Sequence, residues 1–383
     1  MRTIPQHVCG AIPPHMLDWV AAQSADRGAH ARATIEHTRE IATERARAQI
    51  ERPATAVPEA VPPRKRRNVY DAQHEFDLPG KLVMNEHKGR TRDAEVNEAY
   101  DGSGATYDFY ARVFGRRSID NRGMRLDSTV HYGESFSNAL WNGEQMVYGD
   151  GDGEIFNRFT ASLDVIGHEL THGVTQYTAE LDYFGQSGAL NEHISDAFGI
   201  MVKQYVLGQS ASESDWLIGA ELFGPKINAR GIRSMAAPGT AYDDPLLGRD
   251  PQPAHMSDYV ETDDDNGGVH INSGIPNHAF YLAAIPIEEN TWKVLGRVWY
   301  AALTERLEPQ ADFNAFAQAT TDIAGERFGN DGHVQRAVRD AWKAVGLEVP
   351  IYGTDTSHGR HRQRRRTIAA PSLTGKRRQR PAR

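Results

Sequence analysis

The residues His168-Glu169-Leu170-Thr171-His172 combine two imidazoles and a carboxylate at a spacing that suits metal-assisted hydrolysis. Positions four residues apart lie on one face of an α-helix, so His168 and His172 could bind one zinc ion together. Glu169 lies on the same turn and could act as the general base toward a metal-bound water. The same pattern can occur on an amphipathic helix that binds no metal, so the residues downstream must decide between the two interpretations.

A third ligand can be sought downstream, because a catalytic zinc site takes three protein ligands and keeps one position open. Glu192 lies 24 residues after His168 and is the candidate. We expect it near the start of a second helix, and Asn191 and Asp196 beside it could accept the outer N–H of the two imidazoles. The apolar residues that predict this helix are Ile194, Phe198, Met201, Val202 and Tyr205.

The stretch from His168 to Asp196 resembles the core of the thermolysin family of neutral zinc metalloproteases. The resemblance covers roughly residues 68–348, and several further motifs occur in the family's chain order. The short leader around Cys9 and the run Ile12–Leu17 is similar to the protealysin branch, whose precursors carry a brief propeptide. The further motifs are Asn138–Gly143, Met146–Gly151, Ile232–Met235 and Asp265–Gly274.

The resemblance implies an α+β fold with two lobes, the first rich in β-strands and the second mainly helical, with the zinc site in the cleft between them. One helix is expected near Tyr107–Phe114, and helices dominate from Leu163 onward. The Pro-rich and then basic stretch before residue 68 is expected to be an exposed linker that a protease could cut. The predicted division is propeptide 1–52, linker with the maturation cleavage 53–67, N-terminal lobe 68–163, C-terminal lobe 164–350 and basic disordered tail 351–383.

The resemblance also nominates residues that would stabilise the transition state. Glu169 would take a proton from the attacking water and pass it to the leaving amine. Tyr183 and His270 would donate hydrogen bonds to the oxygen that gains negative charge. Asp265 would hold the imidazole of His270, and the turn-forming Asn266-Gly267-Gly268 would bring His270 over the metal.

Substrate binding is expected to depend on backbone pairing. The run Ser137–Trp141 alternates as a strand does, and an edge strand there could pair with an extended peptide. Asn138 and Ala139 would set its register. The resemblance implies that Arg233 contacts a substrate carbonyl on the leaving-group side. The pocket after the scissile bond is expected to be apolar and to select hydrophobic residues; its predicted lining is Phe156, Val165, Ile218, Leu222 and Ile232.

One departure from the family concerns calcium. Asp164 and Asp215 stand at positions that match ligands of the family's double calcium site, but Lys203 stands at another, and two more are the apolar Leu217 and Ala220. Calcium needs six to eight oxygen ligands, so the sequence predicts that this site is lost. Lys203 should pair with Asp164 or Asp215 instead. The expected cofactor is one catalytic zinc ion.

Composition limits the other possibilities. The single cysteine excludes an internal disulfide, no run of 18 apolar residues predicts a membrane span, and no secretory signal peptide is visible. We therefore expect no membrane partner, and either release by a leaderless route or accumulation as an intracellular precursor. The net charge of −8 divides into +9 on residues 351–383 and −17 on the rest. The tail could contact nucleic acid, but the absence of aromatic residues after Tyr352 favours a solvated extension.

The expected function is a zinc endopeptidase made as a zymogen, with peptides or proteins as substrates and its own propeptide as inhibitor. Cys9 could fill the open metal position before activation, since thiolates bind zinc well, or it could be an incidental thiol. Two other functions stay open. A zinc aminopeptidase could share the motif and the distant glutamate, and a non-enzymatic protein could bind its partner through the basic tail.

Overall fold

The structure is a computed structural model that describes residues 10–23, 25–51 and 64–350. Cys9, most of the predicted linker and the basic tail lie outside the described residues. Within them, the chain has a β-rich N-terminal part and a helical C-terminal part, which confirms the predicted α+β class. No helix among the described residues is long and apolar enough to cross a membrane.

The N-terminal part is built on a five-stranded sheet with the order β2-β1-β3-β5-β4. Strands β1, β3 and β5 run parallel, while β2 and β4 pair antiparallel at the two edges. Strand β4 is therefore an edge strand, as the alternation around Ala139 predicted. The strands are β1 (Arg67–Asp71), β2 (Lys81–Asn85), β3 (Leu126–Val130), β4 (Ala139–Trp141) and β5 (Met146–Tyr148).

Helix α3 (Ala94–Phe114) packs on this sheet and is much longer than the predicted helix near Tyr107–Phe114. Asp93 caps its start by accepting from the backbone N–H groups of Glu95 and Val96. Glycine has a low helix propensity, so Gly102 and Gly104 in the middle of α3 made this helix hard to predict from the sequence. Gly102 stands there because α3 lies close to the next long helix: a Cβ at this position would clash with the side chain of Ile166.

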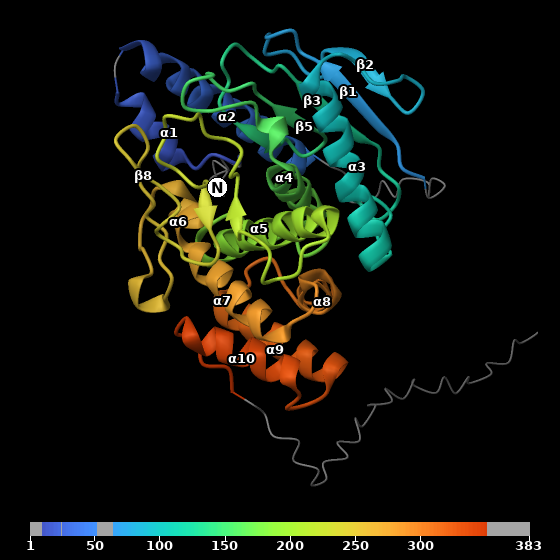
Figure 1. The fold of residues 1–383 in the computed structure, drawn as a ribbon, viewed down its shortest axis with the longest axis vertical. Helices are drawn as coiled ribbons and strands as arrows, with labels where there is room; N and C mark the ends of the chain where they lie inside the picture. Colours follow the sequence, from blue (N-terminus) through green and yellow to red (C-terminus); the bar gives the residue numbers. More distant parts are fainter. Residues whose placement is uncertain (1–9, 24, 52–63, 351–383) are drawn as a thin grey trace, which may run out of the picture. The chain divides into compact units, whose positions relative to one another are not determined.

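The catalytic motif lies on α4 (Leu163–Gln176), which crosses α5 (Gly185–Leu207) closely; in Figure 1, α4 lies between the sheet and α5. A Cβ at Gly167 of α4 would come within 3.1 Å of the Cα of Gly199 on α5, so both helices need glycine where they cross. Glu192 lies two turns inside α5, and the prediction that it stands near the helix start is wrong. The residues in the first two turns of α5 are mostly small or polar, so the sequence shows no helical repeat of apolar residues there.

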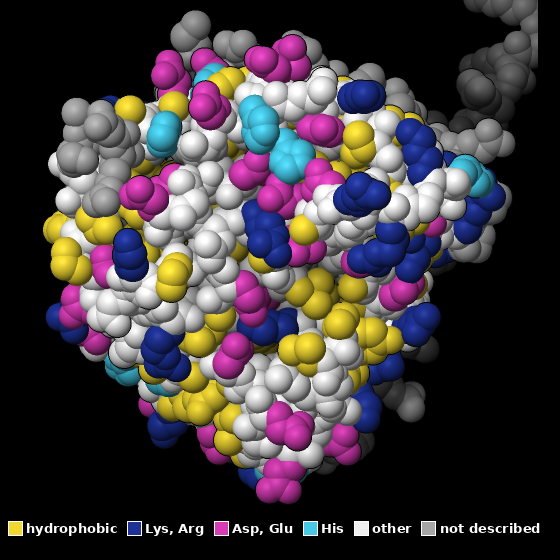
Figure 2. Space-filling model, turned by 45° about the horizontal axis from the view of Figure 1, so that its top comes forward, with side chains coloured by type: hydrophobic (Ala, Val, Ile, Leu, Met, Phe, Trp, Pro, Cys, Tyr) yellow, Lys and Arg dark blue, Asp and Glu magenta, His cyan; other side chains and the backbone are white. Residues whose placement is uncertain are grey.

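The remaining helices and short strands complete the C-terminal part, where α10 packs against both α7 and α9. The face drawn in Figure 2 mixes acidic, basic and histidine side chains, so no single charge dominates it. Before the sheet lie α1 (Pro14–Ala21) and α2 (Ala25–Glu51). The other elements are η1 (Phe159–Ala161), β6 (Leu217–Ile218), β7 (Arg233–Ser234), β8 (Asp243–Asp244), β9 (Gly248–Arg249), η2 (Met256–Asp258), α6 (Asp265–Asn272), α7 (Gly274–Ala284), η3 (Ile285–Ile287), η4 (Thr291–Lys293), α8 (Leu295–Glu305), α9 (Phe313–Phe328) and α10 (His333–Ala344).

Candidate metal centre

The crossing of α4 and α5 brings three buried metal-binding side chains together. The Nε2 atoms of His168 and His172 lie 3.0 Å apart, and they lie 3.5 and 3.4 Å from the carboxylate oxygens of Glu192. Ligands at 2.0–2.1 Å from a tetrahedral zinc ion would stand about 3.3 Å apart, so the spacing fits. Oε2 of Glu192 is buried and makes no hydrogen bond among the described residues. A cation would satisfy it, and the donor set therefore fits zinc.

Both imidazoles are oriented from behind. Nδ1 of His168 lies 2.8 Å from Oδ1 of Asp196, and Nδ1 of His172 lies 2.9 Å from Oδ1 of Asn191. These acceptors keep the proton on Nδ1 and turn the lone pair of Nε2 toward the metal position. The hydroxyl oxygen of Ser195 also lies 3.1 Å from Nδ1 of His172. Ser195 was not predicted as a partner of His172, although it lies four residues after Asn191 and so on the same face of α5.

Asp196 joins the centre to β7. Arg233 donates to both of its oxygens, at 2.7 and 2.8 Å, and Asn277 donates to Oδ2 at 2.8 Å. Burial alone would raise the pKa of Asp196, but the Arg233 charge and the bond with His168 outweigh it and hold the pKa well below its usual range. Arg233 is itself buried, so it forms an internal ion pair. Asn277 was not predicted, because nothing in its surroundings in the sequence marks it.

Glu169 lies one position along α4 from His168 and is fully buried. Its Oε2 accepts a hydrogen bond of 3.0 Å from the backbone N–H of Trp141 on β4. The carboxylate is thus held between the metal-binding helix and the edge strand.

A third group approaches Glu192 from α6. Asn266, Gly267 and Gly268 all have positive φ (53°, 82° and 73°), so the chain turns sharply before His270. Nε2 of His270 lies 3.5 Å from Oε2 of Glu192 and 3.3 Å from the hydroxyl of Tyr183, which also donates to Glu192.

Asp265 fixes the ring of His270 from the other side. Its Oδ1 lies 2.6 Å from Nδ1 of His270, and its Oδ2 accepts from the backbone N–H of the same residue at 2.8 Å. Burial lowers the pKa of His270, but the carboxylates of Glu192 and Asp265 outweigh this effect and raise it to about 9. An imidazole held in this way keeps its proton at neutral pH.

The edge strand is occupied by the chain's own N-terminal segment. The backbone N–H of Ala11 donates to the carbonyl of Ala139 at 2.9 Å, and that of Ile12 donates to Oδ1 of Asn138 at 3.0 Å. The Nη1 atom of Arg233 donates to the carbonyl of Ala11 at 3.4 Å. Three of the residues predicted to hold an extended substrate therefore hold residues of the predicted propeptide.

The apolar residues predicted to line a pocket all have an exposed fraction of 1% or less. They belong to the hydrophobic cluster that also contains Ile12, Met16 and Leu17 of the N-terminal segment. The side chains concerned are Phe156, Val165, Ile218, Leu222 and Ile232.

Lys203 forms ion pairs with both carboxylates that the sequence offered as its partners. Its Nζ lies 2.9 Å from Oδ2 of Asp164, 3.0 Å from Oδ2 of Asp215 and 3.6 Å from Oε1 of Glu221. Burial lowers the pKa of Lys203, but these carboxylates outweigh it and raise the pKa above its ordinary value. The ammonium group therefore sits charged among three carboxylates, of which Glu221 was not foreseen.

The fold and the buried His-His-Glu centre define a metalloendopeptidase. Residues 59–176 match the family model described as the thermolysin metallopeptidase catalytic domain, and residues 179–347 match the thermolysin metallopeptidase alpha-helical domain. The chain belongs to the thermolysin family of metallopeptidases.

Individual relatives agree with this assignment. An extracellular metalloprotease of Pectobacterium carotovorum subsp. carotovorum is 50% identical over 345 residues, which cover 89% of this chain and 97% of that protein. Thermolysin of Bacillus sp. (strain EA1) is 39% identical over 288 residues, 73% of this chain and 50% of that protein. The solved precursor of protealysin, a metalloproteinase from Serratia proteamaculans, is 48% identical with a TM-score of 0.80, and the match covers 88% of this chain and 99% of that chain.

Proposed function

We propose that this chain is a zinc endopeptidase made as a latent precursor and that it cuts peptide bonds before hydrophobic residues. The observation that carries the proposal is a single arrangement of residues. The donor atoms of His168, His172 and Glu192 converge beside Glu169. The neighbouring edge strand already binds the N-terminal segment of the same chain.

Each residue would have a defined task. A zinc ion bound by His168, His172 and Glu192 would supply a Lewis acid and lower the pKa of a bound water to about 7. Glu169 would accept the proton of the attacking water and deliver it to the leaving nitrogen. The N–H of Trp141 keeps its carboxylate in place for both transfers.

Tyr183 and His270 would stabilise the oxyanion of the tetrahedral intermediate. The hydroxyl of Tyr183 and Nε2 of His270 lie 3.3 Å apart and can donate toward one oxygen. Asp265 would keep His270 protonated, in line with the raised pKa of His270. Removing one such donor from an oxyanion site slows catalysis by about 10²–10³-fold.

Substrate would bind as the N-terminal segment does. The main chain of a peptide would pair with Ala139 and with the side chain of Asn138, as Ala11 and Ile12 do. Arg233 would donate to a substrate carbonyl, as it does to that of Ala11. The five apolar residues predicted to line the pocket would favour a hydrophobic side chain after the scissile bond, because a charged side chain would lose its hydration there.

The N-terminal segment would act as an inhibitor until cleavage between residues 53 and 67 allows its release. Because the edge strand can hold one extended chain at a time, residues 10–12 and a substrate exclude each other. The name of the Pectobacterium relative supports action outside the cell. Leaderless release and intracellular accumulation of the precursor are both compatible with this scheme.

We also propose that Lys203 replaces the calcium ions of the family's double site. Its ammonium neutralises Asp164, which is fully buried. A calcium ion would have to displace this ammonium and would still lack oxygen ligands at Leu217 and Ala220.

The experiment is a cleavage assay with internally quenched peptides, each prepared with a blocked and with a free amino terminus. The precursor and the enzyme freed of its N-terminal segment are compared on peptides with Leu, Phe, Asp or Lys after the scissile bond. We expect the freed enzyme alone to cut, and to cut the Leu and Phe peptides at least ten times faster. Activity only on peptides with a free amino terminus would identify an aminopeptidase and contradict the proposal.

A further inference from the structure

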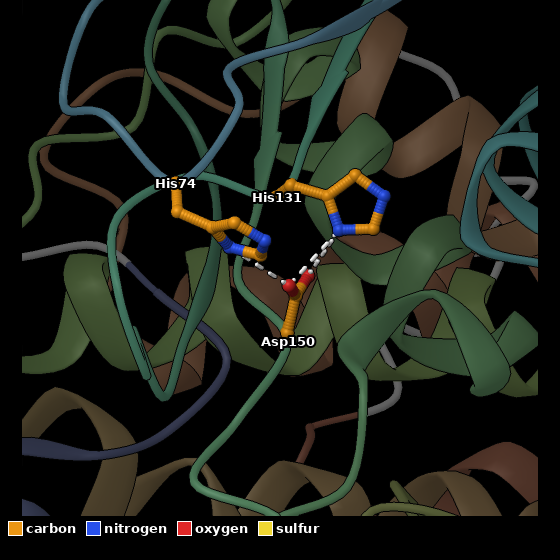
Figure 3. Close-up of side chains that lie close together, drawn as sticks. All are labelled: His74, His131 and Asp150. Atoms are coloured by element: carbon orange, nitrogen blue, oxygen red, sulfur yellow. Dashed lines mark hydrogen bonds and ion pairs between the residues drawn. The ribbon is translucent and has the colours of Figure 1, made fainter. Parts of the chain in front are cut away.

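A second group of metal-binding side chains lies in the β-rich part, away from α4 and α5. Figure 3 shows His74 and His131 with their rings directed toward the carboxylate of Asp150. Glu95 and Asp93 approach His131 from α3. We call His74, Glu95, His131 and Asp150 the strand-end cluster.

The sheet topology places these residues together. Strands β1, β3 and β5 are parallel, so the segments after them leave the same edge of the sheet. His74, His131 and Asp150 each stand one to three residues after one of these strands. The backbone N–H of His74 donates to the carbonyl of His131 at 2.9 Å, which fixes the two histidines side by side. Glu95 stands in the first turn of α3.

The donor atoms have the spacing of a metal site. Nδ1 of His131 lies 2.7 Å from Oε2 of Glu95 and 2.9 Å from Oδ2 of Asp150. Nδ1 of His74 lies 3.4 Å from the same oxygen of Asp150. The ligands of the α4–α5 centre lie 3.0 to 3.5 Å apart. The ligand atoms of His74, His131 and Asp150 all lie within 4.8 Å of one another, and two imidazoles with a carboxylate are ligands that zinc accepts.

The orientation of His131 matches that of a metal ligand. Its Nε2 lies 2.9 Å from Oδ2 of Asp93, just as the outer nitrogen of His168 lies 2.8 Å from Asp196. A carboxylate behind an imidazole turns the opposite nitrogen of the ring toward a metal. The opposite nitrogen, Nδ1, faces the strand-end cluster.

One hydrogen on the ring of His131 cannot serve both carboxylates that lie beside it. Nδ1 of His131 can carry one hydrogen, yet the carboxylates of Asp150 and Glu95 both lie within 3 Å of it. Oε2 of Glu95 is buried and its ion pair with this nitrogen, at 2.7 Å, competes with that of Asp150. Two carboxylates that share one donor repel each other, whereas a divalent cation bound by Asp150 would relieve this repulsion.

We propose that the strand-end cluster is a second zinc site, with His74, His131 and Asp150 as ligands, Asp93 orienting His131 and Glu95 beside the ion. The side chain of His74 is 60% exposed, so the ion can enter from solvent. Figure 2 shows histidine side chains at the surface beside acidic ones. The bound ion would tie together the segments after β1, β3 and β5 and the start of α3, and so would stabilise the β-rich part without touching the reacting atoms.

The test counts and locates zinc in the untagged full-length chain. After equilibration with zinc and removal of the excess, we expect two ions per wild-type chain. An anomalous difference map at the zinc edge should show one peak at the α4–α5 centre and one among His74, His131 and Asp150. A single peak at the α4–α5 centre would overturn the proposal and leave His131 as a protonated partner of its carboxylates.

The variant His74→Asn separates the two sites, because asparagine tolerates the positive φ of 63° at this position. We expect it to weaken binding of the second ion at least tenfold, while peptide hydrolysis by the freed enzyme stays within twofold of wild type. Asp150→Asn should do the same. His87→Asn changes an exposed histidine outside the cluster and should keep both ions. Equal zinc content in all three variants would contradict the ligand assignment.

Discussion

The backbone N–H of Trp141 donates to Oε2 of Glu169 at 3.0 Å, so the strand that binds the N-terminal segment also holds the proposed general base. In the proposed mechanism, this one hydrogen bond would couple substrate binding to proton transfer. Earlier along the same segment, Asn138 and Ala139 are covered by Ala11 and Ile12. Removal of the N-terminal segment would open the edge without moving the base.

Asp196 is expected to support zinc binding through His168. Replacing it with Asn keeps the size of the side chain but removes the negative charge. That charge pairs with Arg233 and strengthens the hydrogen bond with Nδ1 of His168. Loss of such an outer partner weakens metal binding by about 10–100-fold. A zinc-competition titration measures this effect. The exposed Asp263→Asn is the matched control, and equal affinity in both variants would contradict the role of Asp196.

Lys203 is expected to stabilise the fold without calcium. Lys203→Met leaves the fully buried Asp164 without its cation, and breaking a buried ion pair in this way destabilises by about 3–5 kcal/mol. Denaturant unfolding of the wild type and the variant measures the difference.

Calcium itself provides the companion test. A calcium-selective chelator should leave the unfolding midpoint of the wild type unchanged. A large drop after chelation would show that the protein depends on calcium and that Lys203 does not replace it.

Tyr183 is expected to act in the transition state. Tyr183→Phe removes the hydroxyl that lies beside Nε2 of His270, and we expect kcat to fall about 10²-fold with little change in KM. Zinc content should stay at the wild-type value, since Tyr183 is not among the three ligands. A variant with unchanged kcat would remove Tyr183 from the oxyanion site.

His15 is expected to make inhibition by the N-terminal segment depend on pH. Burial lowers the pKa of His15 from 6.5 to about 4, and its Nε2 lies 3.0 Å from the hydroxyl of Tyr242. A released segment takes up a proton below pH 6.5, whereas a bound one does so only near pH 4. Docking should therefore weaken as pH falls from 6.5 to 4, by roughly tenfold per pH unit, and change no further below that.

Inhibition of the freed enzyme by a synthetic peptide of residues 1–23 measures this dependence. The matched peptide with His15→Gln contains every other titrating group and should lack the loss of affinity between pH 6.5 and 4. Parallel pH profiles for the two peptides would rule out His15 as the cause.

The sequence was most informative where chemistry and helical period coincide. His168, His172 and Glu192 could be grouped because two lie one turn apart and the third lies on a recognisable apolar helix. The start of α3 and the depth of Glu192 in α5 were missed, because Gly102, Gly185 and their polar neighbours carry no apolar period. Helix propensity and pattern report burial only where apolar residues recur.

The strand-end cluster was not foreseen for a different reason. His74, His131 and Asp150 are far apart in the chain and lie in turns, where neither spacing nor hydropathy links them. The parallel pairing of β1, β3 and β5 brings them together, and strand order cannot be derived from a single sequence without knowledge of register. Asn277 and Ser195 behind the catalytic ligands depend on tertiary packing in the same way.

The central claim is tested most directly by peptide hydrolysis with the freed enzyme carrying Glu169→Gln, beside the wild type and the exposed control Glu261→Gln. Zinc content is measured on the same preparations. We predict that Glu169→Gln keeps its catalytic zinc and loses roughly three orders of magnitude or more in kcat/KM, while the control matches the wild type. Full activity of Glu169→Gln with zinc still bound would contradict the account.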